Sequence, residues 1–198
     1  MTGGMEFLMP SNASLFLFGA TGAGPVFYYH RWWTVLTASW LHGGFLHILF
    51  NMLWLRQLAP ETAEAYGASR MVIIYTIAGL VGFTLSSFGG SFITVGASAP
   101  IFGLLAAMVH YGRRTGSTMV TRQAMMYAAI LFIFGFFSAR VDNWAHLGGF
   151  AGGYFTAMTL DPLRPERLDH LIGAFVCLGL TAAAVIASVI TGLPFVSG

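Results

Sequence analysis

The sequence contains no lysine, and all of its nine basic residues are arginine. Charged residues make up only 8% of the 198 residues, and the formal net charge is +2. So small and scattered a positive charge excludes the basic surface with which nucleic-acid-binding proteins hold phosphates. A soluble domain of this length would also need far more surface charge to stay in solution. We therefore expect neither a nucleic-acid partner nor a soluble globular fold.

Cysteine is nearly absent as well, since only Cys177 is present, within an apolar run. A single cysteine cannot form an intrachain disulfide, and we interpret it as a packing residue. The sequence also lacks the His-Glu-x-x-His pattern with which many metalloproteases bind zinc. We therefore expect no metal and no other cofactor. A metal site formed by His42, His47 and His146 is an alternative that a chelator would test.

What the sequence has in excess is hydrophobic residues, which make up 57% of it. Lipid is the solvent in which so many apolar side chains can face outwards. Six apolar segments lie at about 41–58, 71–88, 100–111, 124–138, 145–160 and 171–190. We predict an all-α polytopic membrane protein, with about six transmembrane helices in a bundle. Residues 41–198 would form its membrane domain, and 171–190 an additional C-terminal helix.

Residues 1–40 differ from the rest because turn-forming residues surround one short apolar stretch, Leu15–Ala20. That stretch is too short to span a bilayer, which takes ~20 apolar residues. It also lacks the basic region that opens a signal peptide. Aromatic residues at 27–29 and 32–33 are typical of a membrane interface. We predict an extramembrane or interfacial segment.

The arginines predict the orientation in the membrane. If successive connections alternate sides, only Arg31 and Arg140 fall on one side. The other side carries Arg56, Arg70, Arg113, Arg114, Arg122, Arg164 and Arg167. Because basic loops stay in the cytoplasm, we expect that richer side to be cytoplasmic. The segments at 41–58, 100–111 and 145–160 then begin at the outer side.

Polar residues in three of the apolar segments are costly in lipid and need a reason. His47 and Asn51 are spaced i and i+4, which places them on one helix face, and His42 precedes them. Ser98 follows Gly96 where a glycine-rich loop enters a helix. Unpaired N–H groups and the positive end of the helix dipole then surround the Ser98 hydroxyl, as an oxyanion requires.

His146 opens another of these segments, and Gly149 and Gly153 follow it with a spacing that lets helix backbones approach closely. Close approach is what a hydrogen bond between Ser98 and His146 requires. His146 would then act as general base for Ser98. Phe102, one turn beyond Ser98, is a candidate to support the imidazole ring. Taken singly, Ser98 is more often a helix cap and Phe102 more often a core residue.

These motifs resemble those of the rhomboid family of intramembrane serine proteases. Residues 42–51 resemble its His-x4-His-x3-Asn segment, residues 96–99 its Gly-x-Ser-x motif, and residues 145–153 its Ala-His-x2-Gly-x3-Gly helix. Each motif alone is weak, but three in the right order are specific. The resemblance covers most of the chain from about residue 15.

The resemblance implies that Ser98 is the nucleophile and His146 the base of a Ser-His dyad. Asn51, His47 and the Ser98 N–H would stabilise the oxyanion, with Gly96 in a supporting role. The substrates would be single-pass transmembrane proteins cut near the outer membrane boundary. The location would be the lipid bilayer of a bacterial inner membrane, with the active site facing outwards.

Three features depart from the family pattern. The first of the six core helices, upstream of the loop bearing Trp32 and Trp33, has no counterpart in this chain. Thr34 follows Trp33 where the family usually has arginine, and Arg31 is the candidate substitute. Ala99 replaces the commoner glycine after the nucleophile, which would add a methyl group beside the oxyanion site.

Other functions are compatible with such a bundle. A catalytically inactive rhomboid-like protein would bind transmembrane clients without cutting them, and Ser98→Ala would then keep client binding. A transporter or channel would want charged groups near the midplane or paired broken helices, and the sequence has neither pattern.

Overall fold

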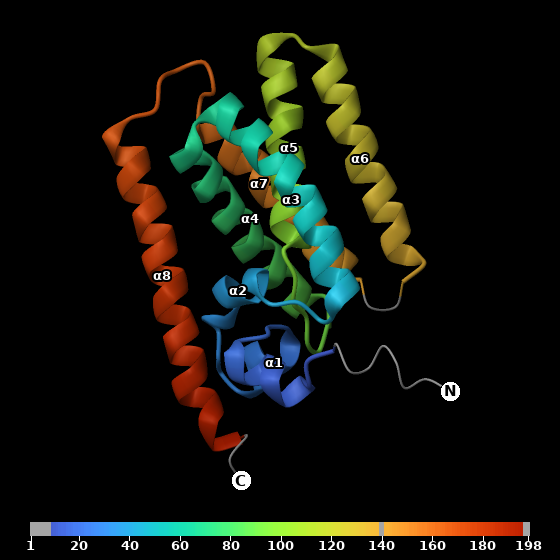
Figure 1. Cartoon of the computed structure of the whole chain (residues 1–198), viewed down its shortest axis with the longest axis vertical. Coiled ribbons are helices and arrows are strands. Elements are labelled where there is room, and N and C mark those ends of the chain that lie inside the picture. Colours follow the sequence, from blue (N-terminus) through green and yellow to red (C-terminus); the bar gives the residue numbers. More distant parts are fainter. Residues whose placement is uncertain (1–8, 139–140, 196–198) are drawn as a thin grey trace.

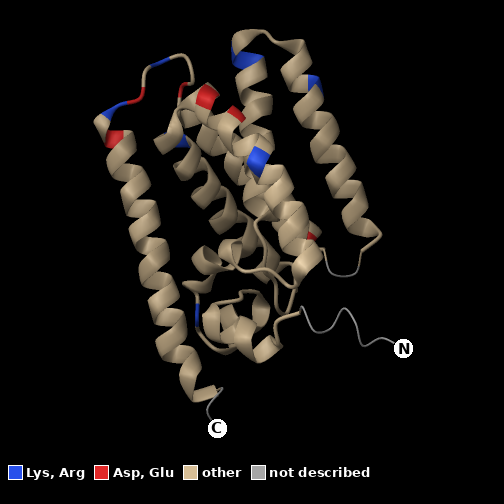
Figure 2. Cartoon of the chain, viewed as in Figure 1, with Lys and Arg blue, Asp and Glu red and all other residues tan. Residues whose placement is uncertain are grey.

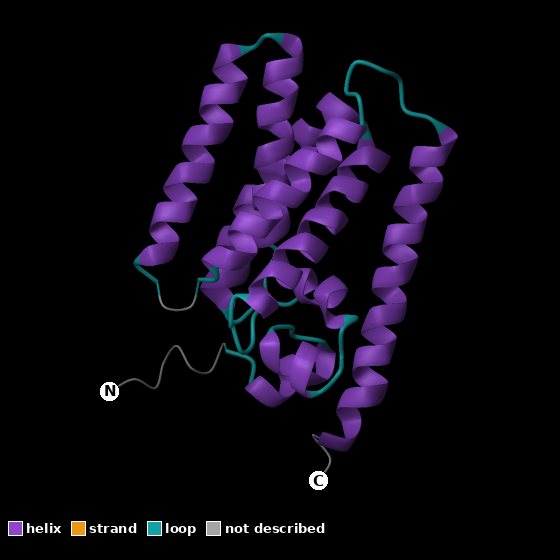
Figure 3. Ribbon diagram, turned by 180° about the vertical axis from the view of Figure 1, so that it is seen from behind, coloured by secondary structure: helices purple, strands orange, loops and turns teal. Residues whose placement is uncertain are grey.

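The computed structural model describes residues 9–138 and 141–195, which form helices and no β-strand (Figure 3). The long helices are α3 (Phe45–Tyr66), α4 (Ala68–Phe88), α5 (Ser98–Thr115), α6 (Thr118–Phe136), α7 (Asn143–Thr159) and α8 (Leu168–Gly192). Each corresponds to one predicted apolar segment, and the predicted all-α bundle is confirmed. Arg140, which entered the orientation argument, lies outside the described residues.

The N-terminal segment folds into short elements at one end of the bundle, beside α8 (Figure 1). These are α1 (Asn12–Phe18), the π-helical turn η2 (Gly24–Tyr28), α2 (Thr34–Thr37) and the 3₁₀ turn η3 (Ala38–Trp40), and a last 3₁₀ turn, η4 (Leu193–Phe195), follows α8. Both α1 and α2 pack against α8. The first eight residues of the predicted segment lie outside the described residues, and its place outside the membrane stays a prediction.

The helix α3 is longer than its apolar run predicts. The run ends near Leu58, but the helix continues through Pro60 to Tyr66. Proline removes one backbone donor, a loss that tertiary contacts can outweigh. Tyr66 supplies such a contact, since its side chain is buried and its hydroxyl donates to the carbonyl oxygen of Ala107 at 3.0 Å. Gly67, with φ of 95°, then ends the helix in the left-handed region.

The helix α5 occupies the middle of the bundle and packs against α3, α4, α6 and α7. Glycines let it approach α7 at backbone distance. A methyl group at Gly149 would collide with the carbonyl group of Ala99, and one at Gly153 would collide with the backbone of Gly103. The close approach expected from the Gly149–Gly153 spacing is therefore present.

Three described helices are long and apolar enough to cross a membrane by length and composition: α4, α6, and the helix over Leu168–Phe195 that includes α8. The α6 and α8 spans are only 17% and 22% buried, compared with 44% for α4. They accordingly flank the bundle on opposite sides (Figure 1). The remaining long helices, α3, α5 and α7, carry the polar residues singled out above.

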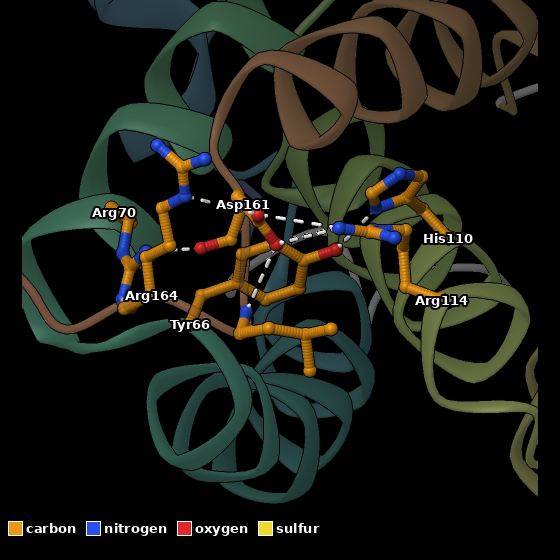
Figure 4. Close-up of polar contacts among 7 residues, drawn as sticks. Tyr66, Arg70, His110, Arg114, Asp161 and Arg164 are labelled. Atoms are coloured by element: carbon orange, nitrogen blue, oxygen red, sulfur yellow. Dashed lines mark hydrogen bonds and ion pairs between the residues drawn. The ribbon is translucent and has the colours of Figure 1, made fainter.

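Charged residues gather at the end of the bundle formed by the C-terminal ends of α3, α5 and α7 (Figure 2). There the buried guanidinium of Arg70, on α4, donates to the carbonyl oxygens of Asp161 and Arg164 at 2.6 and 2.9 Å (Figure 4). The Asp161 carboxylate also pairs with Arg114 at 3.2 Å. These contacts fix the loop between α7 and α8 to the bundle.

Candidate active site

The loop before α5 turns sharply at Gly96, where φ is 135°, a value that disfavours any side chain. The Gly96 N–H donates to the carbonyl oxygen of Ala38 at 2.9 Å, which fixes the loop to the N-terminal segment. Ser98 is then the first residue of α5. The amides of this first turn have no acceptor within the helix, and the positive end of the helix dipole lies beside the hydroxyl.

The hydroxyl of Ser98 lies 2.9 Å from Nε2 of His146. The expected contact between two residues 48 positions apart is therefore made. His146 is buried, with 4% of its surface exposed. Its imidazole stacks on the ring of Phe102, with centroids 4.3 Å apart and planes at 16°. Stacking on one face limits rotation of the imidazole about its side-chain bonds and keeps Nε2 directed at Ser98.

Within residues 9–138 and 141–195, no carboxylate forms a hydrogen bond with this imidazole. Nδ1 of His146 is buried and has no hydrogen-bond partner among the described residues. The nearby Asp142 is committed elsewhere, because its carboxylate accepts from the Ala145 N–H at 3.0 Å and from the hydroxyl of Ser86. Asp142 thereby caps α7 and ties its start to α4. The arrangement is a hydrogen-bonded pair of serine and histidine, held by ring stacking and by the position of α7.

The start of α3 brings His47 to the same place. A methyl group on Gly96 would lie only 2.7 Å from Nε2 of His47, so this imidazole packs directly on the loop before Ser98. Nδ1 of His47 accepts from the Gly43 N–H at 3.2 Å. A neutral imidazole that accepts at Nδ1 carries its proton on Nε2, so His47 presents a donor toward the loop before Ser98.

Asn51 and His42 lie beside His47. Asn51 follows one turn later, is 5% exposed, and donates from Nδ2 to the His47 carbonyl oxygen at 2.7 Å. The rings of His42 and His47 are 5.3 Å apart. No three His, Cys, Asp or Glu side chains form a metal-binding group within residues 9–138 and 141–195. The catalytic and oxyanion-stabilising roles of these residues stay predictions.

Two supporting positions were not singled out from the sequence. Gly82, on α4, lies where three helices meet, since a methyl group there would reach the Ala145 carbonyl at 2.6 Å and the Ala99 side chain at 2.9 Å. Ala78 and Gly79 lie one turn before Gly82 on α4, and this spacing of small residues could have indicated close helix packing there. Ser86, one turn further along α4, is fully buried against Asp142. Its role was not recognisable because it depends on a partner 56 residues away.

The side chain of Ala99 lies in a small apolar cluster rather than free in the site. It is fully buried and packs with Ala38, Phe83 and Ala145. The sequence led us to expect a methyl group beside the oxyanion site. In the structure that methyl group fills space between α4, α5 and α7, so we assign it to packing.

An integral membrane bundle with a Ser-His pair at the start of two touching helices defines a narrow class of proteins. Residues 29–162 match the family model of the rhomboid domain. The chain therefore belongs to the rhomboid family, as its motifs indicate. The family includes intramembrane serine proteases, which act on transmembrane substrates within the bilayer.

Curated relatives agree with this assignment. The chain is 38% identical to RHOMBOID-like protein 2 of Arabidopsis thaliana over 163 residues, which is 79% of this chain and 51% of the relative. It is 37% identical to RHOMBOID-like protein 1 of the same plant, over 80% of this chain and 42% of the relative. Rhomboid protease GluP of Bacillus subtilis is 33% identical over 66% of this chain and 26% of its own length. The chain thus spans about half or less of these relatives.

Proposed function

We propose that this protein is an intramembrane serine endopeptidase that cleaves single-pass transmembrane proteins near the outer membrane boundary. The observation that carries the proposal is the 2.9 Å contact between Ser98 Oγ and His146 Nε2. Membership of a family that includes serine proteases adds to it. The buried position of His146 under Phe102 supports a fixed base rather than a mobile surface residue.

The chemistry follows from where the protons can go. Ser98 Oγ attacks the scissile carbonyl carbon, and its proton passes to Nε2 of His146. The Ser98 N–H and Nε2–H of His47 then donate to the oxyanion, together with the Asn51 amide once it turns from its own helix. When the carbon–nitrogen bond breaks, His146 returns the proton to the leaving amine. Water, deprotonated by His146, then attacks the acyl carbon; the ester bond to Ser98 Oγ breaks, and His146 returns the proton to that oxygen.

A transmembrane helix hides its carbonyl groups in its own hydrogen bonds. A bond that can be cut therefore needs local unwinding, which small or helix-weakening residues near it would favour. We propose that such residues distinguish substrates of this protein from other membrane proteins.

We propose further that the protein lies in a bacterial inner membrane with Ser98 toward the outer side. The charged end of the bundle, which lies away from Ser98, would then face the cytoplasm (Figure 2). A membrane-impermeant maleimide applied to intact cells should label Phe137→Cys, at the Ser98 end, but not Thr115→Cys at the charged end. The reverse labelling pattern would refute this orientation.

A fluorophosphonate probe tests the catalytic proposal directly. We expect it to label Ser98 of the wild type, identified by mass spectrometry of the adduct, and to leave Ser98→Ala and His146→Ala unlabelled although both stay folded. The same variants should lose cleavage of a transmembrane substrate. A folded wild type that is neither labelled nor active would instead support the alternative, an inactive rhomboid-like protein that binds transmembrane clients.

A further inference from the structure

The inner face of α8 becomes polar near its C-terminal end. The residues of this helix that are buried recur on one face: Ala174, Thr181, Ala184, Ser188 and Gly192. Ser188 has no exposed surface, although it lies in a helix that is otherwise among the most apolar of the chain. A buried polar residue on such a helix indicates a specific partner.

The Ser188 hydroxyl accepts from Trp33 and its backbone carbonyl oxygen accepts from Arg31, and both partners lie in the N-terminal segment. Arg31 is 2% exposed, and its guanidinium donates to the Ser188 carbonyl oxygen at 2.6 Å and to the Thr191 hydroxyl at 3.1 Å. It also donates to the Phe16 carbonyl oxygen at 2.7 Å and lies 4.2 Å above the Phe16 ring. The cation thus sits at the C-terminal ends of α8 and α1, where helix dipoles favour positive charge. One side chain joins α8 to the N-terminal segment.

Trp33 makes a second link between the same two parts. Its indole N–H donates to the Ser188 hydroxyl at 3.2 Å. The Ser188 side chain also packs directly against Gly19, where any added methyl group would collide with it. Residues 16–33 are therefore held against α8 at several points, at Ser188 and, through Arg31, at Thr191.

The N-terminal segment is in turn bonded to the loop that precedes Ser98. Thr21 and Thr94 exchange both backbone hydrogen bonds, at 3.1 and 2.7 Å. The N–H groups of Ala23 and Gly24 donate to the carbonyl oxygens of residues 91 and 92 at 2.8 and 3.1 Å. Further on, the Ala38 carbonyl oxygen accepts from Gly96, two residues before Ser98. The loop over residues 91–96, which precedes Ser98, is therefore held in place by backbone hydrogen bonds to the N-terminal segment.

We infer that α8 helps to position the nucleophile, and that Arg31 is the positioning residue that couples them. The inference rests on the function proposed above. The connection runs from Ser188 through Arg31 to the N-terminal segment, and from there to Gly96 and Ser98. It gives α8, which lies beyond the matched rhomboid domain, a part in catalysis without any contact with substrate.

The test uses the full chain and measures the rate at which the fluorophosphonate probe labels Ser98, together with the thermal unfolding temperature. Arg31→Met keeps the aliphatic stem and removes the hydrogen bonds. We expect it to slow labelling of the folded protein about tenfold or more, since small displacements of reacting groups carry large kinetic costs. Arg31→Lys should recover part of the rate. Arg122→Met, at an exposed arginine on α6, is the matched control and should label like the wild type.

Thr191→Val is a second variant, which keeps the test informative if Arg31→Met does not fold. It removes one acceptor of the Arg31 guanidinium and preserves the side-chain shape, so we expect normal folding and labelling slowed about twofold to fivefold. Wild-type labelling rates in every folded Arg31 and Thr191 variant would overturn the inference. A wild type that does not label at all would instead refute the proposed function.

A purely structural role would lower the unfolding temperature and the fraction of protein that can be labelled, with an unchanged rate constant for that fraction. A positioning role lowers the rate constant itself. For the cleavage reaction it should lower kcat and leave KM nearly unchanged, because substrate does not touch Arg31.

Discussion

Gly149 is a position at which a single added methyl group should disturb the contact between Ser98 and His146. It faces the carbonyl group of Ala99, one residue after Ser98, and lies one turn beyond His146. In Gly149→Ala the new methyl group would collide with that carbonyl group. Because the obstacle is backbone rather than a flexible side chain, the two helices must move apart.

Two effects of Gly149→Ala on stability oppose each other. Alanine is a better helix former than glycine by about 1 kcal/mol. Overpacking a tight contact costs about 1–3 kcal/mol. We therefore expect a net loss of about 0–2 kcal/mol in the free energy of unfolding, which leaves the protein folded. Activity should suffer more, because a displacement of ~1 Å between reacting groups costs ~10²-fold in rate.

Labelling of Ser98 by the fluorophosphonate probe and cleavage of a transmembrane substrate, both measured beside thermal unfolding, check this expectation. Gly179→Ala on α8 is the matched control, since a methyl group there meets nothing within 4 Å. It should keep full activity and be as stable as the wild type or slightly more so. Labelling of folded Gly149→Ala at the wild-type rate would refute the claim that helix separation sets the dyad geometry.

Three further predictions concern protonation and packing. The cleavage rate should fall when acid protonates His146, because only a neutral imidazole accepts from Ser98; a rate that stays constant down to the pH at which the protein unfolds would contradict its role as base. The backbone N–H of Leu163, together with the Arg114 guanidinium, lowers the pKa of Asp161 below 3.8. The Asp161 carboxylate therefore stabilises the folded protein above pH 3.8, and this stabilisation is lost as the pH falls through the lowered pKa. Asp161→Asn should abolish this part of the acid sensitivity, as thermal unfolding across pH would measure. Ala99→Gly should lower the unfolding free energy by about 1 kcal/mol and leave the labelling rate within twofold, whereas a large rate increase would place its methyl group back in the oxyanion site.

The sequence predicts those parts of the fold and site that depend on local pattern. Apolar runs predict the long helices because only a helix satisfies its own backbone in lipid. Ser98 and His146 were recognisable because each begins a helix and carries a polar group that lipid disfavours. Gly149 and Gly153 were recognisable from their spacing.

What the sequence did not predict depends on distant partners. The extension of α3 past Pro60 requires the buried Tyr66, whose hydroxyl also lies 2.9 Å from Nδ1 of His110 on α5. Arg31 was expected to be an outer-loop arginine and a candidate for bracing that loop, but its partners on α8 are more than 150 positions away. Neither contact has a local signature, because the residues involved meet only after the helices have packed.

The bundle contains strongly apolar helices and helices that carry polar residues, and the proposed chemistry in a membrane requires both. Hydrolysis needs water and buried polar groups, whereas the bilayer tolerates neither at its surface. The polar groups are accordingly carried by α3, α5 and α7, and the most lipid-exposed spans, α6 and α8, are strongly apolar. Since the inner face of α8 also binds Arg31, this outer helix does more than shield the centre: it is connected to the loop before Ser98 through the Arg31 side chain and the backbone hydrogen bonds of the N-terminal segment.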